Sequence, residues 1–343
     1  MRNDTEGGYG GVGLVIGMKT NMITVVEPMD DSPGFRAGVL PGDRIVKIDG
    51  KSTDKMTTDD AKSKLRGAPD TQVNISIFRP STGESKDIKV TRAVIKVASV
   101  KDINNKIEFP IGEDNIGYVR IIQFGERTAD ELKSALKKLE GQGMQALVLD
   151  LRGNPGGLLD TAVDVCEKFL PRNQLVVSTE GRGSAPKREY RVTGRDQHPK
   201  VPMVVLVNGL SASASEIVAG SLQDLKRAVI VGEQTFGKGS VQSVIPLPDN
   251  SALRLTTAKY YTPSHKVIHE KGITPDIQIP MTEEEERDLF LKRSPGGLDL
   301  LEDKERERVM NARDPQLDRA MDLLKGITLF TKRIPAEKIS AKK

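Results

Sequence analysis

The chain has 343 residues, of which 37% are hydrophobic and 29% charged, and this composition predicts a globular protein of two domains. Its formal net charge of +4 is small and its basic residues are scattered without interleaved aromatic residues, which argues against nucleic acid as a partner. No apolar run is long enough to span a bilayer, and one cysteine excludes an intramolecular disulfide framework.

The first 97 residues contain short apolar or alternating runs separated by turn residues, which is typical of β-rich domains. The predicted strands cover residues 12–16, 23–26, 45–48, 73–78 and 88–90. Two short helices interrupt them, at residues 34–37 and from Thr57, where Asp60 completes a capping box, to Gly67. We expect a small barrel-like sheet with two helices over residues 8–97.

From residue 98 strands alternate with helices, and the predicted strands cover residues 116–124, 146–151, 175–178 and 203–207. The first helix has Thr128 and Glu131 at capping-box spacing, followed by the apolar stripe Leu132, Leu136 and Leu139. Such alternation predicts an α/β core with a mixed, largely parallel sheet over residues 98–280. The single cysteine, Cys166, is expected as a small apolar core residue in the helical stretch 158–170.

The last part of the chain changes character again. A hairpin is predicted from strands 241–246 and 252–260 around an Asp249-Asn250 turn. After Pro280 the sequence is charged and helical, so residues 281–343 are interpreted as a C-terminal helical appendage with a frayed, lysine-rich end.

A glycine-rich loop at residues 10–14 leads directly into a strand, and such a loop forms an anion nest of backbone N–H groups. A peptide that pairs with the edge of this strand would place its terminal carboxylate in the nest, with the helix from Thr57 as the other wall. The glycines would alternatively serve only a tight turn. The candidate tail-binding residues are Gly11, Val12, Gly13, Leu14, Ala61 and Leu65.

The run at residues 31–45, Asp-Ser-Pro-Gly-Phe-Arg-Ala-Gly-Val-Leu-Pro-Gly-Asp-Arg-Ile, resembles the most recognisable segment of bacterial PDZ domains. The resemblance covers the whole first domain and implies that this domain captures peptide tails.

A candidate nucleophile follows the predicted strand 203–207. The run Ser-Ala-Ser-Ala-Ser-Glu at residues 211–216 opens a helix, whose N-terminus offers N–H donors and a positive dipole end to a developing oxyanion. A serine of this run is the candidate. It needs a base, and the chain has only three histidines, His198, His265 and His269, all in polar or turn-like sequence. A histidine triad stays open but has no support in the sequence.

Lysine can replace histidine as a base where burial lowers its pKa. Lys238 lies in the run Phe-Gly-Lys-Gly at residues 236–239, where glycines permit close backbone approach, and Gln242 follows on the next strand. The amide of Gln242 could hold the amine of Lys238. Taken alone, this segment would favour an ordinary solvated loop lysine.

These runs together resemble the carboxyl-terminal processing peptidases, relatives of the tail-specific protease. The resemblance extends from residue 7 to residue 279 and includes residues 149–157, 260–264 and 271–276. It implies a crotonase-like core in which Ser213 is the nucleophile, Lys238 the base and Gln242 a further catalytic residue. It implies no cofactor and no metal.

The end of the strand at residues 146–151 is followed by Asn-Pro-Gly-Gly, whose side-chain-free N–H suits an oxyanion donor. Either Gly156 or Gly157 would supply it, with Ala214 as the second donor; alternatively these glycines serve only a turn. Ser211 and Ser215 are interpreted as helix-start and packing residues, and Glu216 as a local support.

The implied function is a serine endopeptidase that acts on proteins or peptides with free C-termini and processes or degrades envelope proteins, with a possible homo-oligomer. The family suggests the periplasm or cell envelope. Its members usually carry an export signal and a helical segment before the PDZ domain, and neither is evident in this sequence, so the compartment and the oligomeric state stay open.

Three other interpretations compete. The spacing of Gly232, Gly237 and Lys238 nearly spells a phosphate-binding loop, but Gly239 replaces the expected serine or threonine and a strand follows. A catalytically dead PDZ scaffold would not need the serine, lysine and glutamine. A metal site at His265 and His269 has no third ligand.

The short connection between residues 97 and 116 suggests that the PDZ domain gates access to Ser213 as well as tethering substrate. A gate alters turnover at saturating substrate, whereas a tether alters only apparent affinity. Replacing Gly13 by valine is the test that the sequence suggests.

Overall fold

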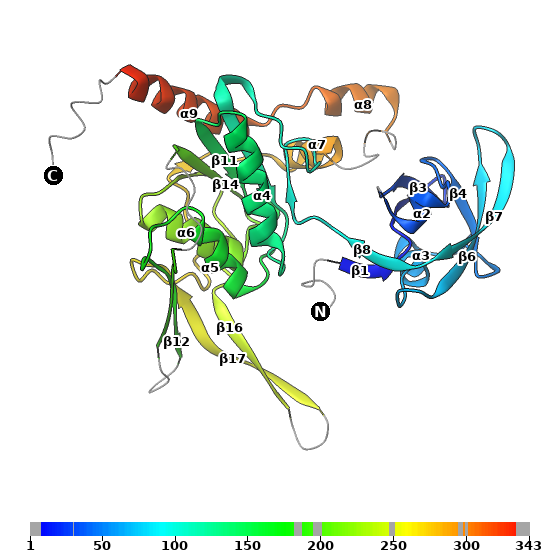
Figure 1. Ribbon diagram of the computed structural model, residues 1–343, viewed down its shortest axis with the longest axis horizontal. Coiled ribbons are helices and arrows are strands. Elements are labelled where there is room, and N and C mark those ends of the chain that lie inside the picture. The colour runs from blue at the N-terminus through cyan, green and yellow to red at the C-terminus, as the bar shows by residue number, and fades with distance from the viewer. Residues whose placement is uncertain are drawn as a thin grey trace. The chain divides into compact units, whose positions relative to one another are not determined.

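The computed structural model describes residues 8–29, 31–181, 187–194, 201–246, 251–293, 298 and 301–333. The chain forms two compact units: Met1–Val97 with Glu283–Ala312, and Ala98–Thr282 with Arg313–Lys343. The C-terminal segment, expected as one appendage at residues 281–343, is therefore divided between the two units. Figure 1 shows the elements of both.

The first unit is built on a β-sheet with the strand order β2-β3-β4-β6-β7, in which β5 pairs with β4. A separate antiparallel pair joins β1 and β8. The elements are β1 (Gly8–Gly11), β2 (Leu14–Lys19), β3 (Met22–Pro28), α2 (Pro33–Arg36), β4 (Arg44–Ile48), β5 (Lys51–Ser52), α3 (Thr58–Leu65), β6 (Gln72–Arg79), β7 (Glu84–Thr91), β8 (Ala93–Lys96), α7 (Glu283–Arg293) and α8 (Asp303–Met310).

Alternation along the strands explains this sheet. On β6, Val73, Ile75 and Ile77 are fully buried and join the core of the unit, while the residues between them lie toward the outside. Helix α3 begins with the predicted capping box, because Thr57 and Asp60 each accept from the other's backbone N–H. Both predicted helices and all five predicted strands of this region are present, with shifted ends.

The second unit contains two sheets. The larger has the order β18-β15-β14-β11-β10-β9, parallel except for β9, and the smaller has the antiparallel order β13-β12-β17-β16. The elements are β9 (Val100–Lys101), η1 (Glu113–Asn115), β10 (Ile116–Ile121), α4 (Thr128–Gly141), β11 (Ala146–Asp150), α5 (Leu159–Glu167), β12 (Leu175–Gly181), β13 (Arg188–Arg191), β14 (Met203–Val207), α6 (Ala214–Asp224), β15 (Val229–Gly232), β16 (Ser240–Pro246), β17 (Ala252–Tyr261), β18 (Ile277–Gln278) and α9 (Pro315–Arg333).

The parallel sheet is buried on both faces, as its continuous apolar strands require. One face packs with α4, α5 and α6, whose apolar residues, Leu132, Leu136 and Leu139 among them, are fully buried in the main core. The other face packs with α9 through Ala320 and Leu324 (Figure 1). Helix α9 is thus part of the second unit, because its apolar stripe covers a sheet face that would otherwise face water.

Two sequence predictions about this unit need correction. The strand predicted at residues 175–178 is present as β12, but it belongs to the smaller antiparallel sheet and not to the parallel one. The capping box of α4 does not form, because Arg127 takes the N-cap position. Instead Thr128 accepts from Gly125 N–H, and the Glu131 carboxylate accepts from Ser99. The Glu131 side chain, which local spacing assigned to the cap, bonds Ser99 instead, a residue distant in the sequence.

The predicted hairpin is present as β16 and β17, whereas its turn at Asp249-Asn250 and the lysine-rich end of the chain lie outside the described residues. Among the described residues, no helix combines the length and the apolar composition that crossing a bilayer requires. Cys166 is fully buried in the main core, as predicted.

Candidate active site

Ser213 occupies a strained turn between β14 and α6. Its backbone dihedrals are φ 55° and ψ −112°, a conformation that a residue with a Cβ rarely adopts. Such strain persists only where the surroundings hold it, and it is frequent at functional sites. The half-buried side chain directly precedes the first residue of α6, Ala214, whose N–H is one of the amides that a helix start leaves without an intrahelical partner.

Hydrogen bonds from the neighbouring strand end hold this turn. The carbonyl of Asn154 accepts from Ala212 N–H at 3.0 Å and from Ser215 Oγ at 2.9 Å. Ser211 Oγ donates to the carbonyl of Leu151 at 2.9 Å. Ser211 and Ser215 therefore hold the turn through their hydroxyl groups.

Gly156, in the turn after β11, lies against the serine, whereas Gly157 lies against Phe124. A Cβ on Gly156 would stand 2.8 Å from Ser213 Cβ and 3.0 Å from Ala214 N, so only glycine fits. The N–H of Gly156 donates to Asn154 Oδ1 at 2.9 Å. Because this amide is already engaged, the N–H of Gly157 is the better candidate for a second oxyanion donor beside Ala214.

Lys238 lies in the loop between β15 and β16. The N–H groups of Gly237 and Lys238 donate to the Glu216 carboxylate, which brings this loop to the start of α6. The Lys238 side chain is exposed, and no hydrogen bond between the described side chains joins it to Ser213. The burial that the sequence argument expects for this amine is therefore absent here. Gln242 pairs with Thr256 in the hairpin, and its side chain lies outside the described part.

Glu216 is the centre of the arrangement. Its fully buried carboxylate accepts from Ser213 N–H at 2.7 Å and Lys238 N–H at 2.9 Å through Oε2, and from Thr235 Oγ1 and Gly237 N–H, both at 2.6 Å, through Oε1. One carboxylate thus joins the serine turn to the lysine loop. From the sequence alone, Glu216 was expected only as a local support. The sequence feature that indicates its larger role is its position three residues after Ser213, which is the spacing of a capping box.

The predicted tail-binding loop lies in the first unit, between β1 and β2. Strand β2 is at the edge of its sheet, and α3 contacts it. Gly13 has a φ of 71°, and its carbonyl accepts from Ser32 Oγ and Met29 N–H. The other predicted residues are buried in the core of the unit: Gly11, Val12, Leu14, Ala61 and Leu65.

The rival sites are not formed. His265 bonds Glu180 at 2.8 Å and stacks on Tyr261, while His269 lies 3.7 Å from the Glu270 carboxylate, and His198 lies outside the described residues. Within the described ranges, no cluster of three or more His, Cys, Asp or Glu side chains is arranged to hold a metal ion. The loop that ends at Lys238 leads into β16, so no helix N-terminus is available for a phosphate.

Comparison with known proteins agrees with this division into two units. Residues 115–279 match the model of peptidase family S41, and residues 24–79 match that of a PDZ domain. A carboxy-terminal-processing protease from Bartonella bacilliformis is 47% identical over 283 residues, which are 81% of this chain and 63% of the relative. The carboxy-terminal processing protease CtpB from Bacillus subtilis is 34% identical over 324 residues, which are 94% of this chain and 64% of the relative.

A solved structure from Bacteroides fragilis, classed with the S41 proteases, has the same fold. Its TM-score is 0.51 at 19% identity, and the match covers 93% of this chain and 83% of that one. The fold and the site define a protein that joins a PDZ domain to an α/β unit with a serine at the start of a helix. The chain belongs to peptidase family S41. It spans less than two thirds of the length of the two curated relatives.

Proposed function

We propose that the protein is a serine endopeptidase that binds the C-terminal tail of protein substrates through its PDZ domain and hydrolyses peptide bonds with Ser213 and Lys238. The observation that carries the proposal is the strained Ser213 turn at the start of α6, with Gly156 against it and the Glu216 carboxylate linking it to the Lys238 loop.

The reaction follows from these positions. Ser213 Oγ attacks the substrate carbonyl as Lys238 Nζ accepts its proton, and the oxyanion forms between the N–H groups of Ala214 and Gly157. The protonated amine then gives its proton to the leaving amine, which completes the acyl-enzyme. Water attacks the ester in the second half of the cycle, with Lys238 again as the base. No cofactor or metal takes part.

The exposed position of Lys238 adds one requirement. Its amine must lose its contact with water before it can act as a base. We assign this desolvation to the bound substrate, which covers the loop at residues 235–239 when its carbonyl reaches Ser213. Gln242, on the strand that follows, is the proposed partner of this amine.

The first unit supplies tail capture. An extended peptide adds to the open edge of β2, beside α3, with its carboxylate at the loop before β2. We propose protein or peptide substrates with free C-termini, the periplasm or cell envelope as the compartment, and a homo-oligomer as the working form, all by analogy with the family.

The test uses unfolded protein substrates that differ only in a free or amidated C-terminus, with products mapped by mass spectrometry. We expect hydrolysis of both, with an apparent KM at least tenfold higher for the amidated form, because the amide loses the charge that the loop recognises. A turnover number that also falls at saturation would indicate that the PDZ domain gates the site. Absence of hydrolysis, together with absence of fluorophosphonate labelling at Ser213, would refute the proposal.

A further inference from the structure

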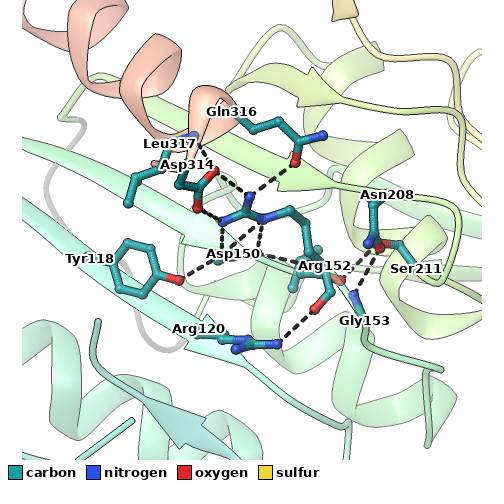
Figure 2. A network of polar contacts seen from close by, with 11 residues as sticks. Tyr118, Arg120, Asp150, Arg152, Gly153, Asn208, Ser211, Asp314, Gln316 and Leu317 are labelled. Carbon is teal, nitrogen blue, oxygen red and sulfur yellow. Dashed lines mark hydrogen bonds and ion pairs between the residues drawn. The ribbon is translucent and has the colours of Figure 1, made fainter. Parts of the chain in front are cut away.

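A buried ionic cluster lies at the end of β11, on the sheet face that α9 covers (Figure 2). Arg152 donates to Asp150 through Nε and Nη2 and to Asp314 through Nη1 and Nη2, with Nη2 distances of 2.6 and 2.8 Å. Tyr118 Oη donates to Asp150 at 2.6 Å, and Gln316 Oε1 accepts from Arg152 at 3.0 Å.

The electrostatics of this cluster favour a fixed geometry. Burial disfavours the charged guanidinium, but the carboxylates of Asp150 and Asp314 outweigh that cost and hold the pKa of Arg152 well above its ordinary value. Two planar carboxylates on one planar guanidinium define its orientation, since the paired bonds are directional. The position of Arg152 is thereby fixed from both sides.

Asp314 connects this cluster to the C-terminal helix. Its Oδ1 also accepts from Leu317 N–H at 3.0 Å, so the same carboxylate caps α9, and Pro315 follows at the first helical position. Gln316 Nε2 donates to the carbonyl of Ile279. The start of α9 is held at this point by side chains, not only by its apolar stripe.

Arg152 directly precedes the turn that reaches Ser213. Gly153 N–H donates to Asn208 Oδ1 at 2.9 Å, which ties the turn to the end of β14. Asn154 then holds Ala212 and Ser215 through its carbonyl and Gly156 through its side chain. A displacement of Arg152 is passed to the serine turn through residues that are one and two positions away in the sequence.

We propose that the Arg152–Asp314 ion pair is a positioning pair: it fixes the end of β11 and, through it, the turn at residues 153–157 against Ser213. The inference rests on the proposed function, and it makes the C-terminal segment, 162 residues further along the chain, a working part of the peptidase site. Neither residue contacts the reacting atoms; each acts through the turn.

The test separates the ion pair from the helix cap. Asp314→Ser keeps a capping oxygen but is too short to reach the guanidinium, and Arg152 keeps Asp150 as a partner, so no uncompensated charge is left. Asp314→Asn keeps the cap and a single hydrogen bond while it removes the charge. The matched control is Lys325→Ala, which removes an ion pair with Asp114 of 2.9 Å elsewhere on the same helix.

Two measurements are made on the full-length variants. Amide hydrogen exchange of peptides that cover residues 153–158 and 211–216 reports the turn directly, because the N–H groups of Gly153 and Gly156 are bonded there. Peptide hydrolysis gives kcat and KM separately. We expect Asp314→Ser to raise exchange in both peptides at least tenfold and to lower kcat at least tenfold with KM within twofold. We expect the exchange and kcat of Asp314→Asn to lie between those of Asp314→Ser and those of Lys325→Ala. Lys325→Ala itself should match the parent protein.

Two results would overturn the inference. In the first, Asp314→Ser leaves exchange in residues 153–158 at the level of the parent protein. In the second, Lys325→Ala produces the same change, because docking of α9 in general would then be responsible. A parent protein that neither hydrolyses peptides nor labels at Ser213 refutes the proposed function, and the exchange comparison still decides whether the pair holds the turn.

Discussion

Two glycine-rich loops of this protein, one before β2 and one after β11, are anchored by different groups. In the loop before β2, carbonyl oxygens are engaged: that of Val12 accepts from Gly34 N–H at 2.7 Å, and that of Gly13 accepts from Ser32 Oγ at 3.0 Å. These bonds use carbonyl oxygens of the loop and not its N–H groups. They are therefore compatible with the proposed role of the loop, in which its N–H groups bind a carboxylate.

In the second unit, which matches peptidase family S41 and is called the peptidase unit, backbone carbonyls such as that of Asn154 are engaged as well, but side-chain oxygens also engage N–H groups. Gly153 donates to Asn208, Gly156 to Asn154, and Ser213 to Glu216. These hydrogen bonds fix the backbone on either side of Gly157 and Ala214, whose amides are the proposed oxyanion donors. The difference teaches that the loop proposed to bind tails and the turn proposed to bind the oxyanion depend on different supporting residues.

The largest effect is expected at the serine turn. Ser213→Ala should lower turnover by a factor of roughly 10⁴ or more, because the nucleophile is lost, while the thermal midpoint changes by less than about 2 °C. Ser134→Ala, which removes an exposed hydroxyl from α4, is the control. Retained peptide hydrolysis in Ser213→Ala would end the assignment of the nucleophile.

Lys238→Ala should lower turnover by about 10³-fold or more, and Lys238→Arg should not restore it, since a guanidinium cannot become neutral to accept a proton. Neither change should alter thermal stability, because the side chain is exposed. Rescue by arginine would show that charge, not basicity, is what the site needs.

Glu216→Gln tests the support of the serine turn. A glutamine side chain has one accepting oxygen where four donors converge, so we expect a loss of about 1–3 kcal/mol in unfolding free energy and about 100-fold in turnover. The control is Thr235→Ser, which keeps the donating hydroxyl. Denaturant unfolding and kinetics that match those of the parent protein would contradict a central role for this carboxylate.

Gly13→Ala tests the support of the other loop. The new Cβ would lie 2.2 Å from Ser32 Cβ at a φ of 71°, so the first unit should lose about 2 kcal/mol or more. Gly38→Ala, at a φ of 76° with nothing within 4 Å, is the matched control for backbone strain alone. This geometry also makes Gly13→Val unsuitable as a test of gating, because the fold would change together with tail binding; amidated substrates avoid the problem.

The smallest effect concerns Cys166, the only cysteine in the chain. Burial raises the pKa of its thiol to about 12, so the folded second unit should not react with iodoacetamide at pH 8. Well below pH 9 the thiol is protonated in both the folded and the unfolded chain, so it adds no pH dependence to the free energy of unfolding. Between pH 9 and 12 only the unfolded chain loses the proton, so stability should fall as pH rises. Thiol labelling in increasing urea then reports unfolding of the peptidase unit separately from the PDZ unit, and rapid labelling without denaturant would contradict the burial.

Much of the fold follows from the sequence alone, because its signals are local. Alternation along residues 73–78 and the capping box at Thr57 each lie within one element, and both are present in the structure. The run at residues 211–216 placed Ser213 correctly at a helix start for the same reason. The capping box predicted at Thr128 failed, because Ser99, which is distant in the sequence, bonds the side chains of both Thr128 and Glu131.

The tertiary structure alone decided the features that join distant segments. It assigned α9 to the peptidase unit, placed Arg152 between Asp150 and Asp314, and made Glu216 the link between Ser213 and the Lys238 loop. It also left the Lys238 side chain exposed where burial was expected. The physical reason is the same in each case: periodicity and short motifs encode what a residue does within its own strand, helix or turn. Burial and hydrogen-bond partners depend on which segments the fold brings together.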